Sequence, residues 1–197
     1  MFNDLWQAEA RRTALRRIMA EEVAADPTLL KLVRLFGLHV IGAYALVAVI
    51  GDIHRFRTPK KLAAYLGFSP STNRSGNGNC DGGSVPWGCG EVRRILIQAA
   101  KAILRFHKNS PVWRWGLGLA YRKGRNLAAF AVGRKLVVAV WYLLKGFFSP
   151  LTETPPVLLR KLEEIAHEIG TKRLAEIGFK DSGVFRDEKL KILKAMT

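Results

Sequence analysis

The chain has 197 residues, 49% of them hydrophobic, which suits one folded domain with appendages and a sizeable core. Lys and Arg number 32 against 16 Asp and Glu, so the net charge is +16. Such an excess points to a polyanionic partner, with nucleic acid first and an anionic membrane surface second. The two cysteines, Cys80 and Cys89, argue against a disulfide-rich secreted scaffold.

The first fifty residues predict helices. Residues 4–25 read as an amphipathic helix, with Leu5, Leu15 and Ile18 available for packing. A helix over residues 29–36, a turn at Gly37 and a second helix to about residue 50 resemble a helix-hairpin-helix. That motif offers backbone N–H groups to a phosphate, but core packing explains the segment equally well.

Residues 35–50 contain no Lys, Arg, Asp or Glu, yet sixteen residues are too few for a membrane span. The N-terminus also lacks the apolar core of a signal peptide. We therefore expect a buried helical hairpin, no membrane partner and, by default, a cytoplasmic protein.

A short helix precedes a polar loop in the middle of the chain. Thr58 is a good N-cap, Pro59 suits the first helical position and Gly67 ends the helix. Residues 68–87 are rich in Gly, Ser and Asn, and a long loop attached to a compact element is more often functional than not. We expect the chemistry of the protein in this loop.

Basic side chains gather on one face of the next predicted helix, residues 90–108. The other face is apolar and consists of Val92, Leu96, Ala99, Ile103 and Phe106. The basic face consists of Arg94, Lys101, Arg105 and Lys108. A basic helix face is usually only solvated, but no acidic residue neutralises this one, so we expect it to contact phosphates. Across residues 88–135, eleven Lys or Arg stand against one acid, Glu91, for a net charge of +10.

The remaining segments also predict helices. Ser110, before a proline, is typical of a helix start, and Trp113 and Trp115 behind it are more typical of a core than of base stacking. Residues 127–146 read as a strongly apolar helix, and Thr154 begins the charged C-terminal helices. There is no internal repeat and no convincing strand pattern, so the predicted fold class is all-α.

Ser75 is the candidate nucleophile in the polar loop. It lies between Arg74 and Gly76, and Arg93 and Arg94 begin the basic helix. Attack of a hydroxyl on a phosphodiester builds negative charge that guanidinium groups can stabilise. A serine used in this way forms a covalent link to a DNA end, whereas a serine in a polar loop ordinarily has only a structural role.

A metal site is not predicted. Cys80 and Cys89 lie nine residues apart without a second pair, so zinc would need distant histidines such as His54 or His107. Reduced, unpaired cysteines are the better interpretation.

A series of motifs runs through residues 29–146. The most specific is Ala-Tyr-Leu-Gly-Phe-Ser-Pro at residues 64–70, followed by Ser75-Gly76. With weaker matches at residues 35–48, 50–56, 93–96, 108–111 and 133–137, the chain resembles the C-terminal transposase domain of insertion-sequence transposases related to the Piv invertase. These enzymes are also called bridge-RNA-guided serine recombinases.

The resemblance implies a mostly helical domain in which Ser75, at the family's Ser-Ser-Gly position, attacks DNA and becomes covalently attached. It also implies an N-terminal RuvC-like domain whose four acidic residues bind magnesium. This chain begins after that domain, so we expect a truncated copy or isolated domain with no cofactor of its own. DNA is the expected partner, and the resemblance allows a guide RNA and a homo-oligomer.

We therefore expect a DNA-binding transposase domain that acts in DNA transposition or site-specific recombination, and whose activity without the acidic domain stays open. The alternative is a non-catalytic nucleic-acid-binding module. Besides the nucleophile Ser75, the predicted phosphate-binding residues are Arg74, Arg93, Arg94, Lys101, Arg105 and Lys108. The predicted domains are a helical connector remnant (1–28), the transposase domain (29–148) and short charged C-terminal helices (149–197).

Overall fold

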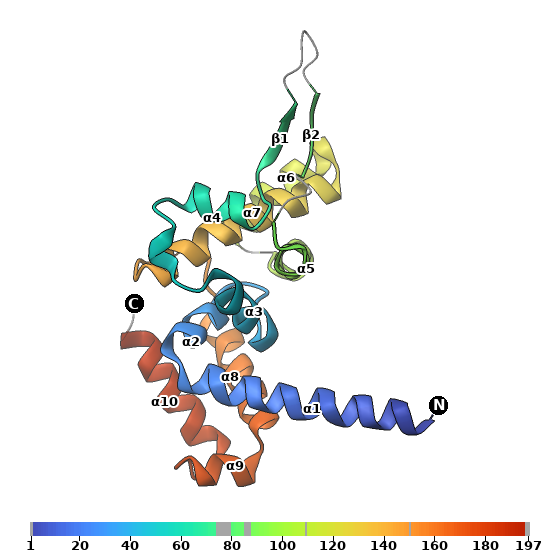
Figure 1. The fold of residues 1–197 in the computed structure, drawn as a ribbon. Helices are drawn as coiled ribbons and strands as arrows, with labels where there is room; N and C mark the ends of the chain where they lie inside the picture. Colours follow the sequence, from blue (N-terminus) through green and yellow to red (C-terminus); the bar gives the residue numbers. More distant parts are fainter. Residues whose placement is uncertain (1, 74–79, 85–87, 109, 150, 196–197) are drawn as a thin grey trace. The chain divides into compact units, whose positions relative to one another are not determined.

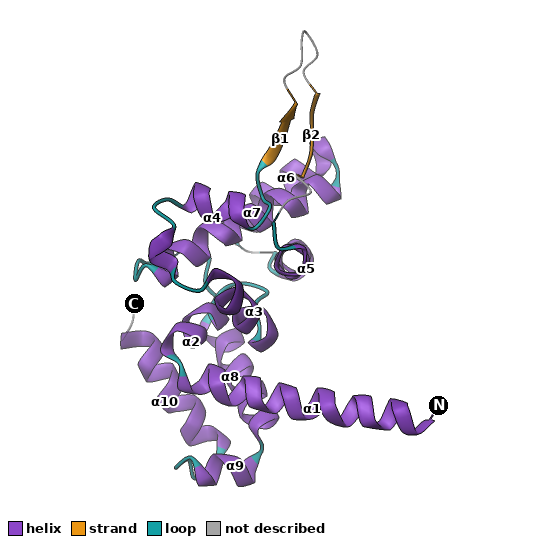
Figure 2. Cartoon of the chain, in the orientation of Figure 1, coloured by secondary structure: helices purple, strands orange, loops and turns teal. Residues whose placement is uncertain are grey.

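The computed structural model describes residues 2–73, 80–84, 88–108, 110–149 and 151–195. These residues form helices and one short antiparallel ribbon (Figure 1 and Figure 2), so the predicted helical class is confirmed. The ribbon pairs β1 (Pro70–Asn73) with β2 (Cys80–Ser84) inside the segment expected to be a loop. Its residues show no alternation of apolar and polar side chains, so the pairing leaves no pattern in the sequence.

The chain divides into two compact units. Unit 1 consists of Met1–Ala48 and Thr152–Thr197, and unit 2 of Val49–Leu151. The boundaries of these units differ from those of the three segments expected from the sequence, which are 1–28, 29–148 and 149–197. Both ends of the chain belong to unit 1, because residues 33–38 contact residues 152–161 and no local pattern reports such distant contacts.

Unit 1 takes its helices from both parts of the chain. The first part supplies α1 (Phe2–Ala25), α2 (Pro27–Val33) and most of α3 (Val40–Ile50). The last part supplies α8 (Pro155–Ile169), α9 (Thr171–Glu176) and α10 (Ser182–Ala195). α1 packs on α2 and α8, and α8 packs on α10. Leu162, Ile165 and Phe185 are fully buried, so the C-terminal helices form part of a core.

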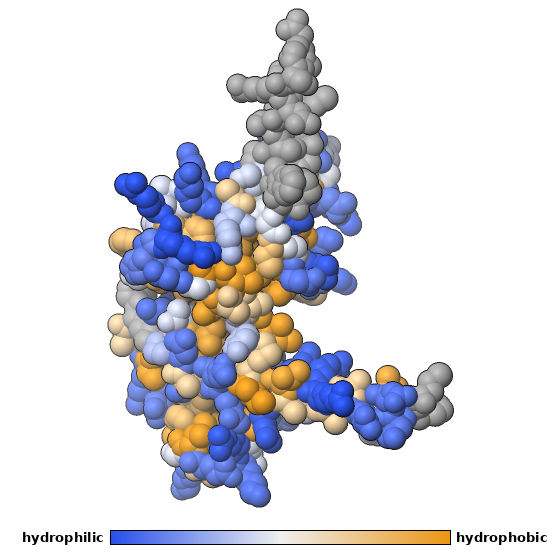
Figure 3. Space-filling view, viewed as in Figure 1, coloured by the Kyte–Doolittle hydropathy of each residue, from blue (hydrophilic) through white to orange (hydrophobic). Residues whose placement is uncertain are grey.

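The N-terminal half of α1 does not pack as the sequence predicts. Leu5, Leu15 and Ile18 are 66%, 60% and 51% exposed, and Figure 3 shows hydrophobic among hydrophilic side chains along this helix. Among the described side chains of α1, the buried ones are Ala20, Val23 and Ala24 near its C-terminus. The apolar pattern is thus used only in the last two turns, next to α2.

A buried ion pair closes the helical hairpin of unit 1. Gly37 has a φ of +69° in the turn between α2 and α3, and its N–H donates to Glu153 Oε1 at 3.3 Å. Lys161 Nζ lies 2.9 Å from the same oxygen and donates to the carbonyls of Val33, Leu35 and Leu38. In this structure the turn that resembles a phosphate-binding hairpin holds a carboxylate of its own chain.

In unit 2, α7 (Arg125–Leu144) is the central helix. α4 (Pro59–Tyr65), α5 (Gly90–Phe106) and α6 (Pro111–Lys123) pack against it. α7 is also the one helix of the described residues that is long and apolar enough to cross a membrane. Half of its apolar stretch is buried, and core helices of soluble proteins have the same length and composition.

Two helix starts follow the predicted capping. Thr58 Oγ1 accepts the Lys61 N–H of α4 at 3.4 Å, and Ser110 Oγ accepts the Trp113 N–H of α6 at 3.1 Å. Gly67 ends the turn after α4 with a φ of +77°, a conformation that favours glycine.

Candidate functional site

The outer face of α5 is basic and exposed, as the sequence predicts. Lys101, Arg105 and Lys108 are exposed, and Arg93 is half-buried. The inner face buries Val92, Leu96, Ala99 and Ile103. Phe106 was expected on that inner face but is 69% exposed, because it is the last residue of α5 and the helix is capped at His107.

Arg94 differs from the other bases of this face because it has an acidic partner. Its Nη1 lies 3.1 Å from Glu91 Oε2, one helical turn earlier, and both side chains are exposed. The expectation that no acidic residue neutralises the face is therefore wrong at Arg94. An exposed pair of this kind is weak, at about 0–1 kcal/mol, so a phosphate can replace Glu91 as the partner.

Lys101 and Arg105 line a groove formed by three helices. α6 contributes Leu117 and Ala120, and α7 contributes Arg125 and Asn126. The groove, which Leu104 also lines, has a volume of about 490 Å³, and none of these lining residues is acidic. We call it the α5–α6–α7 groove. Its lining combines apolar side chains with three cations, which suits a polyanion with an apolar or aromatic part.

Sequence reasoning missed the contribution of α7 to this groove. Arg125 belongs to the basic turn Arg122-Lys123-Gly124-Arg125. The sequence shows this turn but does not show which helix it lies beside. Gly124, with a φ of +87°, joins α6 to α7 and so brings Arg125 beside α5. The structure thus brings two of the predicted phosphate-binding residues together with Arg125, whereas Arg93, Arg94 and Lys108 do not line the groove.

Ser75 and Arg74 lie outside the described residues, between β1 and β2 in the sequence. The described residues that flank this part of the sequence, Gly67 and Gly88, lie close together. A Cβ on Gly88 would lie 2.7 Å from the Gly67 N and 2.9 Å from the Tyr65 carbonyl oxygen, so the backbone before α5 touches the backbone after α4. The start of α5, with Arg93 and Arg94, therefore lies at the base of this segment.

The net charge is concentrated in unit 2. That unit holds 17 of the 32 Lys and Arg but only 3 of the 16 acids, a net charge of +14. Unit 1 holds 15 bases and 13 acids, a net charge of +2. The basic character of the chain is therefore a property of one unit.

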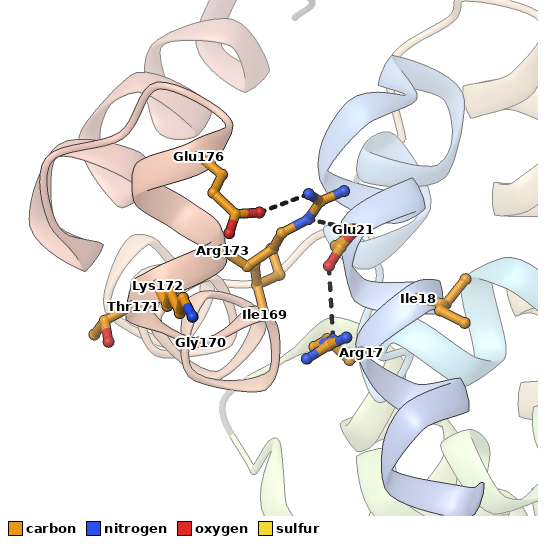
Figure 4. A pocket seen from close by; sticks show the side chains of 9 residues that line it. All are labelled: Arg17, Ile18, Glu21, Ile169, Gly170, Thr171, Lys172, Arg173 and Glu176. Carbon is orange, nitrogen blue, oxygen red and sulfur yellow. Dashed lines mark hydrogen bonds and ion pairs between the residues drawn. The ribbon is translucent and has the colours of Figure 1, made fainter.

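One cation of each unit illustrates two kinds of partner. In unit 1, Arg173 donates to Glu176 at 2.8 Å and to Glu21 at 3.2 Å (Figure 4), and these hydrogen bonds raise the pKa of its guanidinium. In unit 2, Lys135 Nζ instead lies 4.4 Å from the centre of the Trp115 ring. A ring attracts a cation but does not cancel its charge, so such a lysine still attracts anions.

Among the described side chains, no group of three or more His, Cys, Asp or Glu is placed to hold a metal ion. Cys89, which precedes α5, is a free, half-buried thiol.

Comparison with known proteins gives a consistent result. Residues 31–114, from α2 to the start of α6, match the model of the transposase IS116/IS110/IS902 family. A probable family 20 transposase of Pseudomonas aeruginosa is 32% identical over 144 residues, which are 72% of this chain and 43% of that protein. The transposase for insertion sequence element IS1111A of Coxiella burnetii is 34% identical over 110 residues, which are 55% of this chain and 30% of that protein.

The chain spans less than half the length of these curated relatives. No solved structure matches it significantly. The family match includes the motifs on α4, the ribbon and the basic helix α5. Through residues 31–114, the chain therefore carries a transposase domain of the IS116/IS110/IS902 family.

Proposed function

We propose that this chain binds duplex DNA in the transposition of an insertion sequence, and that it does so through unit 2. The observation that carries the proposal is the α5–α6–α7 groove, where Lys101, Arg105 and Arg125 converge without an acidic residue in the lining. The net charge of +14 on the same unit would draw DNA to it over longer distances.

Ser75 is the proposed nucleophile. Its Oγ gives up its proton and attacks a phosphorus of the DNA backbone. An Oγ–P bond forms while one P–O bond to deoxyribose breaks, and the leaving oxygen takes up a proton. Arg74, Arg93 and Arg94 are the proposed partners of the phosphate oxygens. The family match and the place of Arg93 and Arg94 at the base of the segment that contains Ser75 support this assignment.

The remaining participants are proposed from the resemblance. Magnesium would be held by acidic residues of a RuvC-like domain supplied by another chain or another segment. A guide RNA and a second copy of the chain are further proposed partners. The residues of this chain would then position the DNA backbone and supply the hydroxyl.

A salt titration tests the binding proposal. The affinity for a 20-base-pair duplex should fall with salt, with log affinity changing by roughly −0.9 per log unit of salt for each phosphate neutralised. Changing Lys101, Arg105 and Arg125 together to Ala should make that slope shallower by up to about 3. A slope that does not change in this variant would place the DNA surface elsewhere.

The variant Ser75→Ala tests whether Ser75 is the nucleophile. It should leave affinity nearly unchanged, because one hydroxyl adds little to binding dominated by phosphate charge. The chain is mixed with magnesium, a cognate element end and a full-length family transposase whose own serine is changed to Ala. A covalent DNA adduct should then form on the wild-type chain and be absent with Ser75→Ala. DNA binding without any adduct would favour the non-catalytic nucleic-acid-binding module.

A further inference from the structure

A second group of cations lies at the other end of α7. It consists of Arg55, Arg57, Lys60 and Lys145, from η1 (Ile53–Arg55), the start of α4 and the C-terminal end of α7. We call this group the η1–α4 cluster. Arg55, Arg57 and Lys60 are exposed, and Lys145 is half-buried. We propose that the η1–α4 cluster is a second DNA-backbone contact, separate from the α5–α6–α7 groove; it rests on the proposed DNA binding of unit 2.

Aromatic rings position Arg55 within this cluster. The Arg55 guanidinium lies 4.7 Å from the centre of the Phe56 ring and 4.6 Å from that of Tyr65. The Trp141 indole N–H donates to the Phe56 carbonyl at 2.9 Å, which fixes η1 against α7. Cation–π contacts orient an arginine while leaving its donors available to a phosphate.

Lys145 joins the cluster from the end of α7. Its Nζ lies 3.1 Å from His54 Nδ1 and 5.8 Å from the centre of the Trp141 ring. An ammonium can only donate, so His54 Nδ1 is the acceptor. A neutral imidazole and an indole orient Lys145 without cancelling its charge, and the same lysine caps α7 at its negative end.

Little negative charge opposes the cluster. The acidic residue of the segment 49–68 is Asp52, and one of its carboxylate oxygens accepts the His54 N–H at 2.8 Å as the cap of η1. The same segment and the end of α7 contain five basic residues, which are Arg55, Arg57, Lys60, Lys61 and Lys145. Unit 1 shows the contrasting arrangement, because its Arg173 and Arg186 each bind two carboxylates.

The length of α7 separates the two surfaces. Arg125 in the groove and Lys145 in the cluster are the first residue and the C-cap of a 20-residue helix, which is about 30 Å long. One turn of B-DNA spans roughly 34 Å. The two surfaces are therefore too far apart to share one phosphate, so each adds its own contribution to the salt dependence.

The test is a salt titration of the full chain with a 20-base-pair duplex. Arg57→Ala/Lys60→Ala leaves the ring-held Arg55 and Lys145 in place and should reduce the slope by about 2, roughly 0.9 for each base. The reduction should be equal in the wild-type chain and in a Lys101→Ala/Arg105→Ala background. Lys172→Ala/Lys191→Ala, two exposed lysines of unit 1, is the matched control with the same loss of charge and should keep the wild-type slope.

The outcomes separate this inference from the proposed function. If the wild-type chain shows no salt-dependent binding to the duplex, the proposed function fails. If binding is present and responds to the groove variant but not to Arg57→Ala/Lys60→Ala, only the second surface is overturned. A loss of binding to vesicles of anionic lipid without any loss of DNA binding would also overturn it, since the cluster would then face a membrane. Circular dichroism of each variant checks that the helices are retained.

Discussion

Lys161 joins two parts of unit 1 that lie more than 120 residues apart in the sequence. Its ammonium donates to three carbonyls at the end of α2 and in the following turn, at 2.7 to 2.9 Å, and lies 2.9 Å from Glu153. The carbonyls at the C-terminus of a helix lack partners within the helix, and Lys161 supplies one. Burial lowers the pKa of Lys161, while the Glu153 carboxylate opposes that shift.

Lys161→Met should therefore destabilise the protein by about 3–5 kcal/mol, because it leaves the Glu153 carboxylate buried without its cation. The double variant Glu153→Gln/Lys161→Met should recover part of that loss, since no buried charge remains. Chemical denaturation followed by circular dichroism gives the free energies of unfolding. Lys172→Met, at an exposed position, serves as the control and should change stability by no more than about 0.5 kcal/mol. Equal values for Lys161→Met and Lys172→Met would show that the buried pair has no stabilising role.

At the scale of elements, close packing in unit 2 depends on Gly133. A Cβ at this position of α7 would lie 2.7 Å from Cε1 and 3.2 Å from Cζ of Phe68. The Phe68 ring is fully buried and stacks on Phe130 with 5.0 Å between the ring centres. Phe68 comes directly before the segment that forms the ribbon, so this contact attaches that segment to α7.

Gly133→Ala should lower the free energy of unfolding by roughly 1–3 kcal/mol, because a rigid ring must move to admit the methyl group. Gly118→Ala in α6 is the matched control, since its Cβ would meet nothing within 4 Å. That change should raise stability by about 0.5–1 kcal/mol, the helix preference of Ala over Gly. Thermal and urea unfolding of both variants measure the difference. A Gly133→Ala protein as stable as Gly118→Ala would contradict the close contact.

Elements with local signals were predictable from the sequence. The caps at Thr58 and Ser110 and the basic face of α5 depend on residues within a turn or two of each other, so the pattern reports them. The ribbon and the division into units depend on backbone pairing or distant contacts, which no local pattern carries. The candidate site was predictable in the same way: Lys101 and Arg105 came from helical periodicity, whereas Arg125 needed the packing of α7. Ser75 lies outside the described residues and stays a prediction.

At the scale of the whole molecule, unit 2 is a continuous segment and unit 1 is not. Residues 1–48 of unit 1 depend on residues 152–197 for Glu153 and Lys161, and Arg34 Nη1 also donates to the Leu193 carbonyl at 3.0 Å. The helices that pack on α7, which are α4, α5 and α6, all belong to unit 2.

A chain that stops after Leu151 should therefore lose unit 1 and keep unit 2. Amide hydrogen exchange should show protection in α2 and α3 falling by about 100-fold or more, equivalent to about 3 kcal/mol, because the buried contacts with α8 are gone. Amides of α5 and α7 should keep the protection seen in the full chain. Unchanged protection in α2 and α3 would mean that the first 48 residues fold without the C-terminal helices.

The insertion of unit 2 between the two parts of unit 1 also sets an order of folding during synthesis. A ribosome adds about 5–20 residues per second, and domains generally fold as units as they emerge. Unit 2 is complete once residue 151 has left the exit tunnel, whereas unit 1 must wait for a further 46 residues, which takes a few seconds. During that interval the nascent chain presents a folded basic unit together with residues 1–48, whose helix α1 still lacks its packing partner α8. Residues 1–48 are thus made before unit 2 but reach their native state after it, and chaperones that bind apolar segments have a defined interval in which to act.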